Sequence, residues 1–153
     1  SYNKYLKVPE LIKLQETLSD PVSHDEMLFI IIHQTYELWF KQILHEIDAS
    51  IKWIREDRMF RANHSLRAVV AIEKVIVSQI HILETMAQIG FLEFRDKLNP
   101  ASGFQSMQFR ELEFVSGAKD EKTVRFFEKS DDFAFRRLTE RFDEPSLPDE
   151  FWS

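Results

Sequence analysis

The sequence contains no cysteine, and it has only three glycines and five prolines among 153 residues. Without cysteine, the chain can form neither disulfides nor metal centres ligated by its own thiolates. Folds rich in β-sheet use many tight turns that depend on glycine and proline, so the scarcity of both favours helices. We therefore expect an all-α protein.

A basic stripe and a long apolar run are also missing. The net charge is −6 with both signs interspersed, which argues against a nucleic acid as partner. The longest apolar stretch, residues 27–32, is far too short to cross a bilayer, and the first residues lack the apolar run of a signal peptide. We therefore expect neither a nucleic acid nor a membrane as partner, and a cytoplasmic location.

Two long stretches without glycine or proline predict two long helices. In residues 24–55 apolar side chains recur every three or four positions, as in a helix packed on two sides. Ser23 and Glu26 have the spacing of a capping box at its start. Residues 60–89 predict a second helix ending at Gly90. Its expected buried side consists of seven residues: Val69, Val70, Ile72, Val75, Ile76, Ile80 and Ile82.

Shorter helices complete the expected fold. The pattern predicts them over residues 91–98, 104–114, 119–129 and 132–142, and a further helix begins after Ser146. We expect the two long helices to pair antiparallel, with the shorter ones beside them, in a single helical domain over residues 1–153. Because the last helix is cut in its first turns, we expect this domain to be incomplete and to belong to a longer protein.

Several common site motifs are absent: the sequence has no glycine-rich phosphate loop, no G-x-S-x-G elbow and no H-E-x-x-H zinc helix. His33 and Glu37 stand four residues apart and could share a metal ion, although a hydrogen bond on the helix face is the far commoner arrangement. The apolar Tyr2, Tyr5 and Leu6 near the start predict that this terminus docks on the core or on a neighbouring subunit.

One remaining set of residues suits a flat amino acid. His33 is flanked by aromatic residues and can accept a hydrogen bond from a ring N–H, and Phe29 and Phe91 offer flat surfaces. Arg95 can bind a carboxylate with two parallel hydrogen bonds. An indole amino acid needs these three features. By spacing alone the ordinary roles remain open, namely a core histidine, packed phenylalanines and a solvated arginine.

Two long motifs indicate a family. Residues 24–41, His-Asp-Glu-Met-Leu-Phe-Ile-Ile-Ile-His-Gln-Thr-Tyr-Glu-Leu-Trp-Phe-Lys, resemble the opening motif of the tryptophan 2,3-dioxygenases. Phe94-Arg95 followed by residues 100–110, Pro-Ala-Ser-Gly-Phe-Gln-Ser-Met-Gln-Phe-Arg, resemble their second motif. The resemblance runs over most of the chain and weakens after about Gly117. It implies an all-helical, tetrameric enzyme with the tryptophan/indoleamine dioxygenase fold.

The same resemblance implies an activity and residue roles. The enzyme would use haem b to insert O2 into the indole ring of L-tryptophan, giving N-formylkynurenine in the first step of the kynurenine route. His33 would be the catalytic residue on the distal side of the haem and would bind the indole N–H. Phe29 and Phe91 would wall the indole, and Arg95 would bind the carboxylate.

Further roles follow for the loops and the terminus. Tyr5 and Leu6 would contact substrate in a neighbouring subunit, and Ser102 and Gly103 would lie beside the haem edge. The family's proximal histidine lies in its C-terminal half. None of the five histidines here matches it (His24, His33, His45, His64 and His81), so we expect the iron to be ligated by a residue outside this chain.

Two alternatives remain open at this point. The chain could be a catalytically silent helical module that retains the family's subunit contacts. It could also come from a family member that oxidises a related indole or adds a single oxygen atom. The residues present do not separate these readings from the standard reaction.

Overall fold

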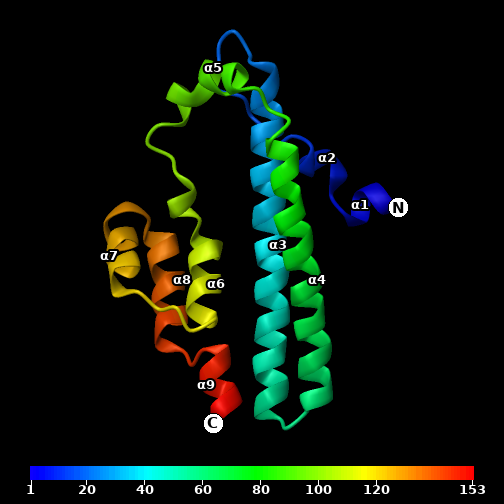
Figure 1. The fold of residues 1–153 in the computed structure, drawn as a ribbon, viewed down its shortest axis with the longest axis vertical. Coiled ribbons are helices and arrows are strands. Elements are labelled where there is room, and N and C mark those ends of the chain that lie inside the picture. Colours follow the sequence, from blue (N-terminus) through cyan, green and yellow to red (C-terminus); the bar gives the residue numbers. More distant parts are fainter. The chain divides into compact units, whose positions relative to one another are not determined.

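The computed structural model describes all of residues 1–153 and is helical throughout, which confirms the all-α prediction. Figure 1 shows the order of the elements along the chain. They are α1 (Tyr2–Tyr5), α2 (Val8–Leu11), α3 (His24–Arg55), α4 (Met59–Leu83), α5 (Gln88–Leu98), the 3-10 turn η1 (Gly103–Gln105), α6 (Met107–Val115), α7 (Glu121–Ser130), α8 (Asp132–Asp143) and α9 (Leu147–Trp152). No helix is both long enough and apolar enough to pass through a membrane.

The chain divides into two compact units, which are described separately. Unit 1 consists of Ser1–Tyr36 and Ser78–Ser102, and unit 2 consists of Glu37–Val77 and Gly103–Ser153. The long helices α3 and α4 each contribute residues to both units.

The core of unit 2 forms where the two long helices lie antiparallel (Figure 1). A short turn joins them, and in it Asp57 adopts a left-handed conformation with φ of 56°. Across the pair, the Ser50 hydroxyl donates to the Ala62 carbonyl at 3.3 Å. The buried residues of this core come from α3, α4 and α6: Ile43, Leu44, Ile47, Ile51, Val69 and Val115. Ile43 and Ile47 belong to the apolar stripe that the helical spacing predicts for this helix.

A second cluster joins α6, α7 and α8 within unit 2. Its buried members are Phe114, Phe127, Ala134 and Leu138. Aspartates cap α7 and α8 at their N-termini. The Asp120 side chain accepts from Lys122 N–H, and the Asp131 side chain accepts from Ala134 N–H. At α9, Ser146 and Asp149 form a reciprocal capping box, which confirms the helix start predicted after Ser146.

The end of the second long helix differs from the prediction. It ends at Leu83 rather than at residue 89, and Gly90 lies inside α5 instead of terminating a helix. The Thr85 hydroxyl donates to the Ile82 carbonyl at 2.6 Å, and Met86 N–H closes a turn on Leu83. Such local bonds compete with the helical ladder, and they mark the point where α4 stops.

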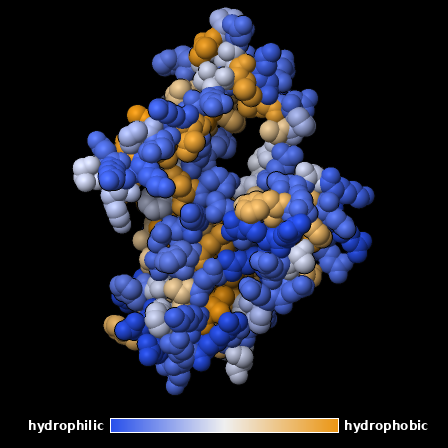
Figure 2. Space-filling model, turned by 180° about the vertical axis from the view of Figure 1, so that it is seen from behind, coloured by the Kyte–Doolittle hydropathy of each residue, from blue (hydrophilic) through white to orange (hydrophobic).

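The buried side predicted for the second helix is only partly right. Val69 is buried, and Ile72 and Ile76 pack on the core. The prediction was wrong for Val70, Val75, Ile80 and Ile82, whose exposed fractions are 50%, 42%, 50% and 45%. Tyr2, Tyr5 and Leu6 are exposed as well, so this terminus does not dock on the core of its own chain. Figure 2 shows hydrophobic residues, in orange, at the surface among hydrophilic ones.

Candidate functional site

Four rings gather in unit 1 and form what we call the aromatic cluster: Phe29 and His33 of α3 with Phe91 and Phe94 of α5. The ring centroids of Phe29 and His33 are 4.2 Å apart, and those of Phe29 and Phe91 are 6.0 Å apart. Phe94 lies 5.5 Å from both Phe29 and Phe91. The separations between the phenylalanine rings are those at which tilted and edge-to-face aromatic pairs attract one another, and His33 lies still closer to Phe29.

The cluster has a buried base and an accessible side. Phe94 is completely buried, whereas Phe29 and Phe91 are half-buried and His33 is exposed. Next to Phe91 lies a cavity of about 370 Å³, lined by Leu83, Met86, Ala87, Gln88, Phe91 and Leu92. Phe94 was not among the predicted site residues, although its position three residues after Phe91 places both rings on the same side of α5.

His33 is held in one orientation by its own helix. Its Nδ1 lies 2.7 Å from the backbone carbonyl oxygen of Phe29. A carbonyl oxygen only accepts, so Nδ1 carries the proton and Nε2 of the neutral ring is left as an acceptor. An acceptor at the exposed edge of an aromatic surface is what a ring N–H of a flat ligand requires.

Arg95 follows Phe94 on α5, and its side chain is exposed with no ion pair or hydrogen bond to another residue. Its guanidinium group is therefore available to an external carboxylate. The structure thus brings Phe29, His33 and Phe91 together. Of the predicted site residues, only Phe91 lines the cavity of about 370 Å³, whereas Phe29, His33 and Arg95 do not.

The other predicted site residues lie outside the aromatic cluster. Tyr5 is 86% exposed and Leu6 is 44% exposed, both near the start of the chain. Ser102 and Gly103 are exposed on the loop that follows α5. A Cβ added to Gly103 would meet no atom within 4 Å, so the space beside this residue is open.

A buried carboxylate, which the sequence analysis placed in a capping box, anchors the segment that precedes α3. Glu26 is 1% exposed and accepts hydrogen bonds from Leu18 N–H at 2.7 Å, from Ser19 N–H at 3.0 Å and from the Ser19 hydroxyl. Burial alone would raise the pKa of Glu26, but these hydrogen bonds outweigh it, and the pKa is lowered. The capping-box prediction was therefore wrong, because the carboxylate turns towards the preceding loop, and the Ser23 N–H donates to the Ser19 side chain instead.

A second polar group ties the same segment to α3. Gln15 Nε2 donates to Gln34 Oε1 at 2.7 Å, and Gln34 Nε2 donates to the Leu14 carbonyl at 2.8 Å. Gln34 adjoins His33 in the sequence, so the segment is anchored close to the aromatic cluster. No spacing rule reveals such pairs, because their partners lie 19 and 20 residues apart.

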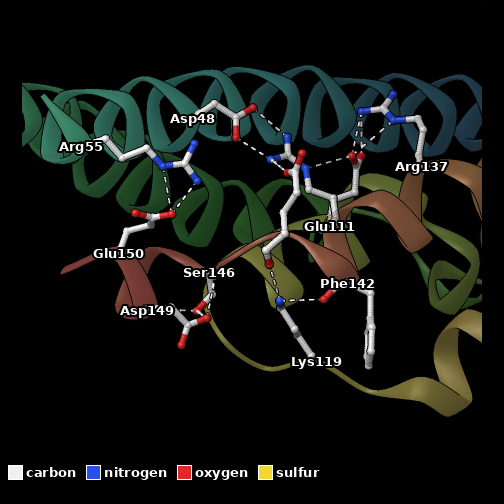
Figure 3. Close-up of polar contacts among 11 residues, drawn as sticks. Asp48, Arg55, Glu111, Lys119, Arg137, Phe142, Ser146, Asp149 and Glu150 are labelled. Carbon is white, nitrogen blue, oxygen red and sulfur yellow. Dashed lines mark hydrogen bonds and ion pairs between the residues drawn. The ribbon is translucent and has the colours of Figure 1, made fainter. Parts of the chain in front are cut away.

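Unit 2 contains a network of ion pairs around a buried glutamate (Figure 3). Glu111 is 2% exposed, and Arg137 Nη2 donates to both of its oxygens, at 2.8 and 3.0 Å. Arg141 donates to both Asp48 oxygens, at 2.5 and 2.7 Å, and its pKa is raised mainly by this pairing. Separately, Arg55 donates to Glu150 at 2.5 Å and lowers the pKa of that carboxyl. The network around Glu111 connects α3, α6 and α8, and the pair of Arg55 and Glu150 connects α3 with α9.

The same network lines a cavity of about 550 Å³ in unit 2. Its charged lining consists of four cations (Lys52, Arg55, Arg137 and Arg141) and four carboxylates (Asp48, Glu111, Glu140 and Glu144), so the charges balance. The three arginines already bind carboxylates of this chain. The network therefore acts as a structural tie between helices.

Comparisons with known proteins show the family of the chain. The family model "Tryptophan 2,3-dioxygenase" matches residues 1–146. Proteins named tryptophan 2,3-dioxygenase from Nocardioides sp., Herpetosiphon aurantiacus and Anopheles gambiae are 51%, 48% and 44% identical over 99%, 99% and 97% of this chain. The chain covers 58%, 57% and 41% of these three proteins, so it spans about half the length of the curated relatives that it matches.

Proposed function

Because the chain belongs to the tryptophan 2,3-dioxygenase family, we propose that it provides the distal substrate-binding part of an enzyme that inserts O2 into the indole ring of L-tryptophan to give N-formylkynurenine. The observation that carries this proposal is the meeting of Phe29, His33 and Phe91 in unit 1. In this role Phe29 and Phe91 bind the indole ring between α3 and α5. His33 Nε2 accepts the indole N–H, and Arg95 binds the substrate carboxylate.

The proposal assigns haem b as the cofactor, which supplies the activation of O2 when it is bound. The residues of this chain suit contacts with the edge of the haem rather than ligation of the haem iron. Ser102 and Gly103 are exposed, and the space beside Gly103 is open. All five histidines of the chain are exposed, and His33 already bonds its own helix through Nδ1. We propose that the proximal ligand comes from the remainder of the enzyme.

The oligomeric state and the cellular location of the enzyme are also part of the proposed function. Tyr5 and Leu6 are exposed near the start of the chain, which suits residues that enter a neighbouring subunit's site. We propose a homotetramer in which they complete the substrate pocket of a second copy. A cytoplasmic location fits a chain without a membrane-crossing helix.

The activity is tested by completing the chain. Residues 1–153 are fused to the C-terminal part of the Nocardioides relative that this chain does not cover. The fusion is assayed with haem, O2 and L-tryptophan for N-formylkynurenine by mass spectrometry. We expect product from the fusion and none from a fusion that carries His33→Ala and Arg95→Ala together. A folded, haem-loaded fusion that makes no product would contradict the proposed reaction.

The haem absorbance spectrum of the chain by itself separates the proposal from a silent helical module. After haem is added to the purified 153-residue chain, L-tryptophan is titrated while the Soret band is followed. A band that shifts with tryptophan indicates a substrate site beside the cofactor. Unchanged free-haem absorbance, together with no heat of tryptophan binding, indicates a module that serves assembly alone.

A further inference from the structure

Three side chains from the two family motifs meet within unit 2, and the proposed function gives a role to none of them. Glu37 belongs to the first motif, in α3, whereas Ser106 and Gln108 belong to the second, at the start of α6. The Ser106 hydroxyl donates to Glu37 Oε1 at 2.5 Å. Gln108 Nε2 donates to Glu37 Oε2 at 2.9 Å and to the Glu37 backbone carbonyl at 2.7 Å. Both carboxylate oxygens are therefore engaged by α6.

Glu37 also sets the direction of the Ser106 hydroxyl. Ser106 is the N-cap of α6, and its Oγ accepts from Phe109 N–H at 3.2 Å. A hydroxyl has one proton, so donating it to Glu37 leaves the oxygen lone pairs for Phe109. A cap of this kind satisfies a backbone donor that the helix itself leaves unpaired. The carboxylate on α3 thus fixes the first turn of α6.

The turn η1 depends on the same anchor. Ser106 N–H donates to the Gly103 carbonyl at 3.1 Å, and Arg110 Nε donates to the Phe104 carbonyl at 3.2 Å. Gly103 has no side chain, and the space beside its Cα is open. Gly103 is therefore tied to the start of α6 by its hydrogen bond with Ser106, while the ring of the neighbouring Phe104 packs on Phe126 at 5.2 Å between centroids.

We propose that Glu37 is a positioning residue that holds η1 and the start of α6 in place against α3. Its functional consequence rests on the proposed function, which places Gly103 at the cofactor edge. In this chain the carboxylate of the first motif is thus paired with the hydroxyl and the amide of the second.

The test measures amide hydrogen exchange by NMR in the 153-residue chain, at Ser106, Phe109 and Arg110. The variants are Glu37→Ala, Glu37→Gln and the swap Glu37→Gln with Gln108→Glu, which pairs an amide with a carboxylate again in reversed order. We expect exchange on the order of tenfold faster in both single variants, and recovery of most of this change in the swap. Glu73→Gln, at an exposed position of α4, is the matched loss of charge and leaves the three rates unchanged.

The Phe135 amide, which donates to the Asp131 carbonyl in α8, serves as an internal reference. Unchanged rates at Ser106, Phe109 and Arg110 in Glu37→Ala would overturn the proposal. Equal acceleration at Phe135 would overturn it too, because the variant would then loosen the whole unit. Neither haem nor tryptophan is present in this experiment. The exchange rates therefore test the role of Glu37 even if the proposed function is wrong. If the rates do not change in Glu37→Ala, the role of Glu37 is refuted even if the chain binds tryptophan.

Discussion

The imidazole of His33 packs on the ring of Phe29 at 4.2 Å between centroids, while its Nδ1 lies 2.7 Å from the Phe29 carbonyl oxygen one helical turn earlier. The two contacts fix both the plane and the tautomer of the imidazole without any partner from outside α3. The acceptor Nε2 therefore exists before a ligand arrives, and the interaction depends little on reorganisation.

The first prediction concerns the acceptor. His33→Phe keeps an aromatic ring but removes Nε2, and we expect it to weaken L-tryptophan binding about tenfold, the effect of one hydrogen bond of roughly 1 to 1.5 kcal/mol. Binding of 1-methyl-L-tryptophan, which has no ring N–H, should be equal in the wild type and the variant. Titration calorimetry measures both. An equal loss for the two ligands would mean that His33 acts by shape and not as an acceptor.

The second prediction concerns the carboxylate. Arg95→Ala should weaken L-tryptophan binding by about 10- to 100-fold, since hydrogen bonds to charged groups contribute roughly 1.5 to 3 kcal/mol. Tryptamine has no carboxylate, and its affinity should not change. Lys97→Ala, which removes another exposed cation of α5, is the control and should bind both ligands normally. If Lys97→Ala lowers tryptophan affinity as much as Arg95→Ala, the effect is general electrostatics.

The third prediction concerns the base of the aromatic cluster. Phe94 is completely buried, so Phe94→Ala should lower the free energy of unfolding by about 3 to 5 kcal/mol. Phe60 is 87% exposed, and Phe60→Ala should change it by no more than about 0.5 kcal/mol. Urea denaturation followed by circular dichroism gives both values. Similar losses in the two variants would contradict the burial described for Phe94.

The fourth prediction concerns pH. Since the folded state lowers the pKa of Glu26 from its ordinary value of 4.5, the ionised carboxylate stabilises the fold above that value. This contribution is lost as the pH falls through the lowered pKa. Glu26→Gln should therefore be less stable than the wild type at pH 7, and the difference should shrink once the pH drops below about 4.5. Glu16→Gln, at an exposed position, should show no such dependence on pH. A difference between the wild type and Glu26→Gln that persists at low pH would assign the effect to shape.

Local patterns were enough to predict the helices that carry the cluster. The stretch from residue 24 to residue 55 has no helix breaker and keeps helical spacing, and α3 has these bounds. The same periodicity does not say which apolar positions are covered. Val70 and Ile80 fit a buried stripe by spacing, yet both are 50% exposed. Periodicity reports that a face is apolar, while burial depends on what lies opposite.

The site residues were predicted one by one from the sequence, but the hydrogen bonds that hold the neighbouring segments in place could not be predicted in this way. The meeting of Phe29, His33 and Phe91 is consistent with the prediction, whereas the binding roles of Arg95, Tyr5, Leu6, Ser102 and Gly103 remain predictions. The partners of Glu26 and Glu37 were missed because each side chain has several possible partners and the choice depends on tertiary structure. For Glu37 the sequence offered a neighbouring histidine, but the structure gives it two partners about 70 residues away.

The most direct test of the central claim is an isotope-filtered NMR measurement of contacts between L-tryptophan and the phenylalanine rings of the 153-residue chain. If the aromatic cluster holds the indole, nuclear Overhauser effects will connect the indole protons to the rings of both Phe29 and Phe91, and they will vanish in Phe29→Ala with Phe91→Ala. Contacts confined to other phenylalanines, or contacts that survive in that double variant, would contradict the account.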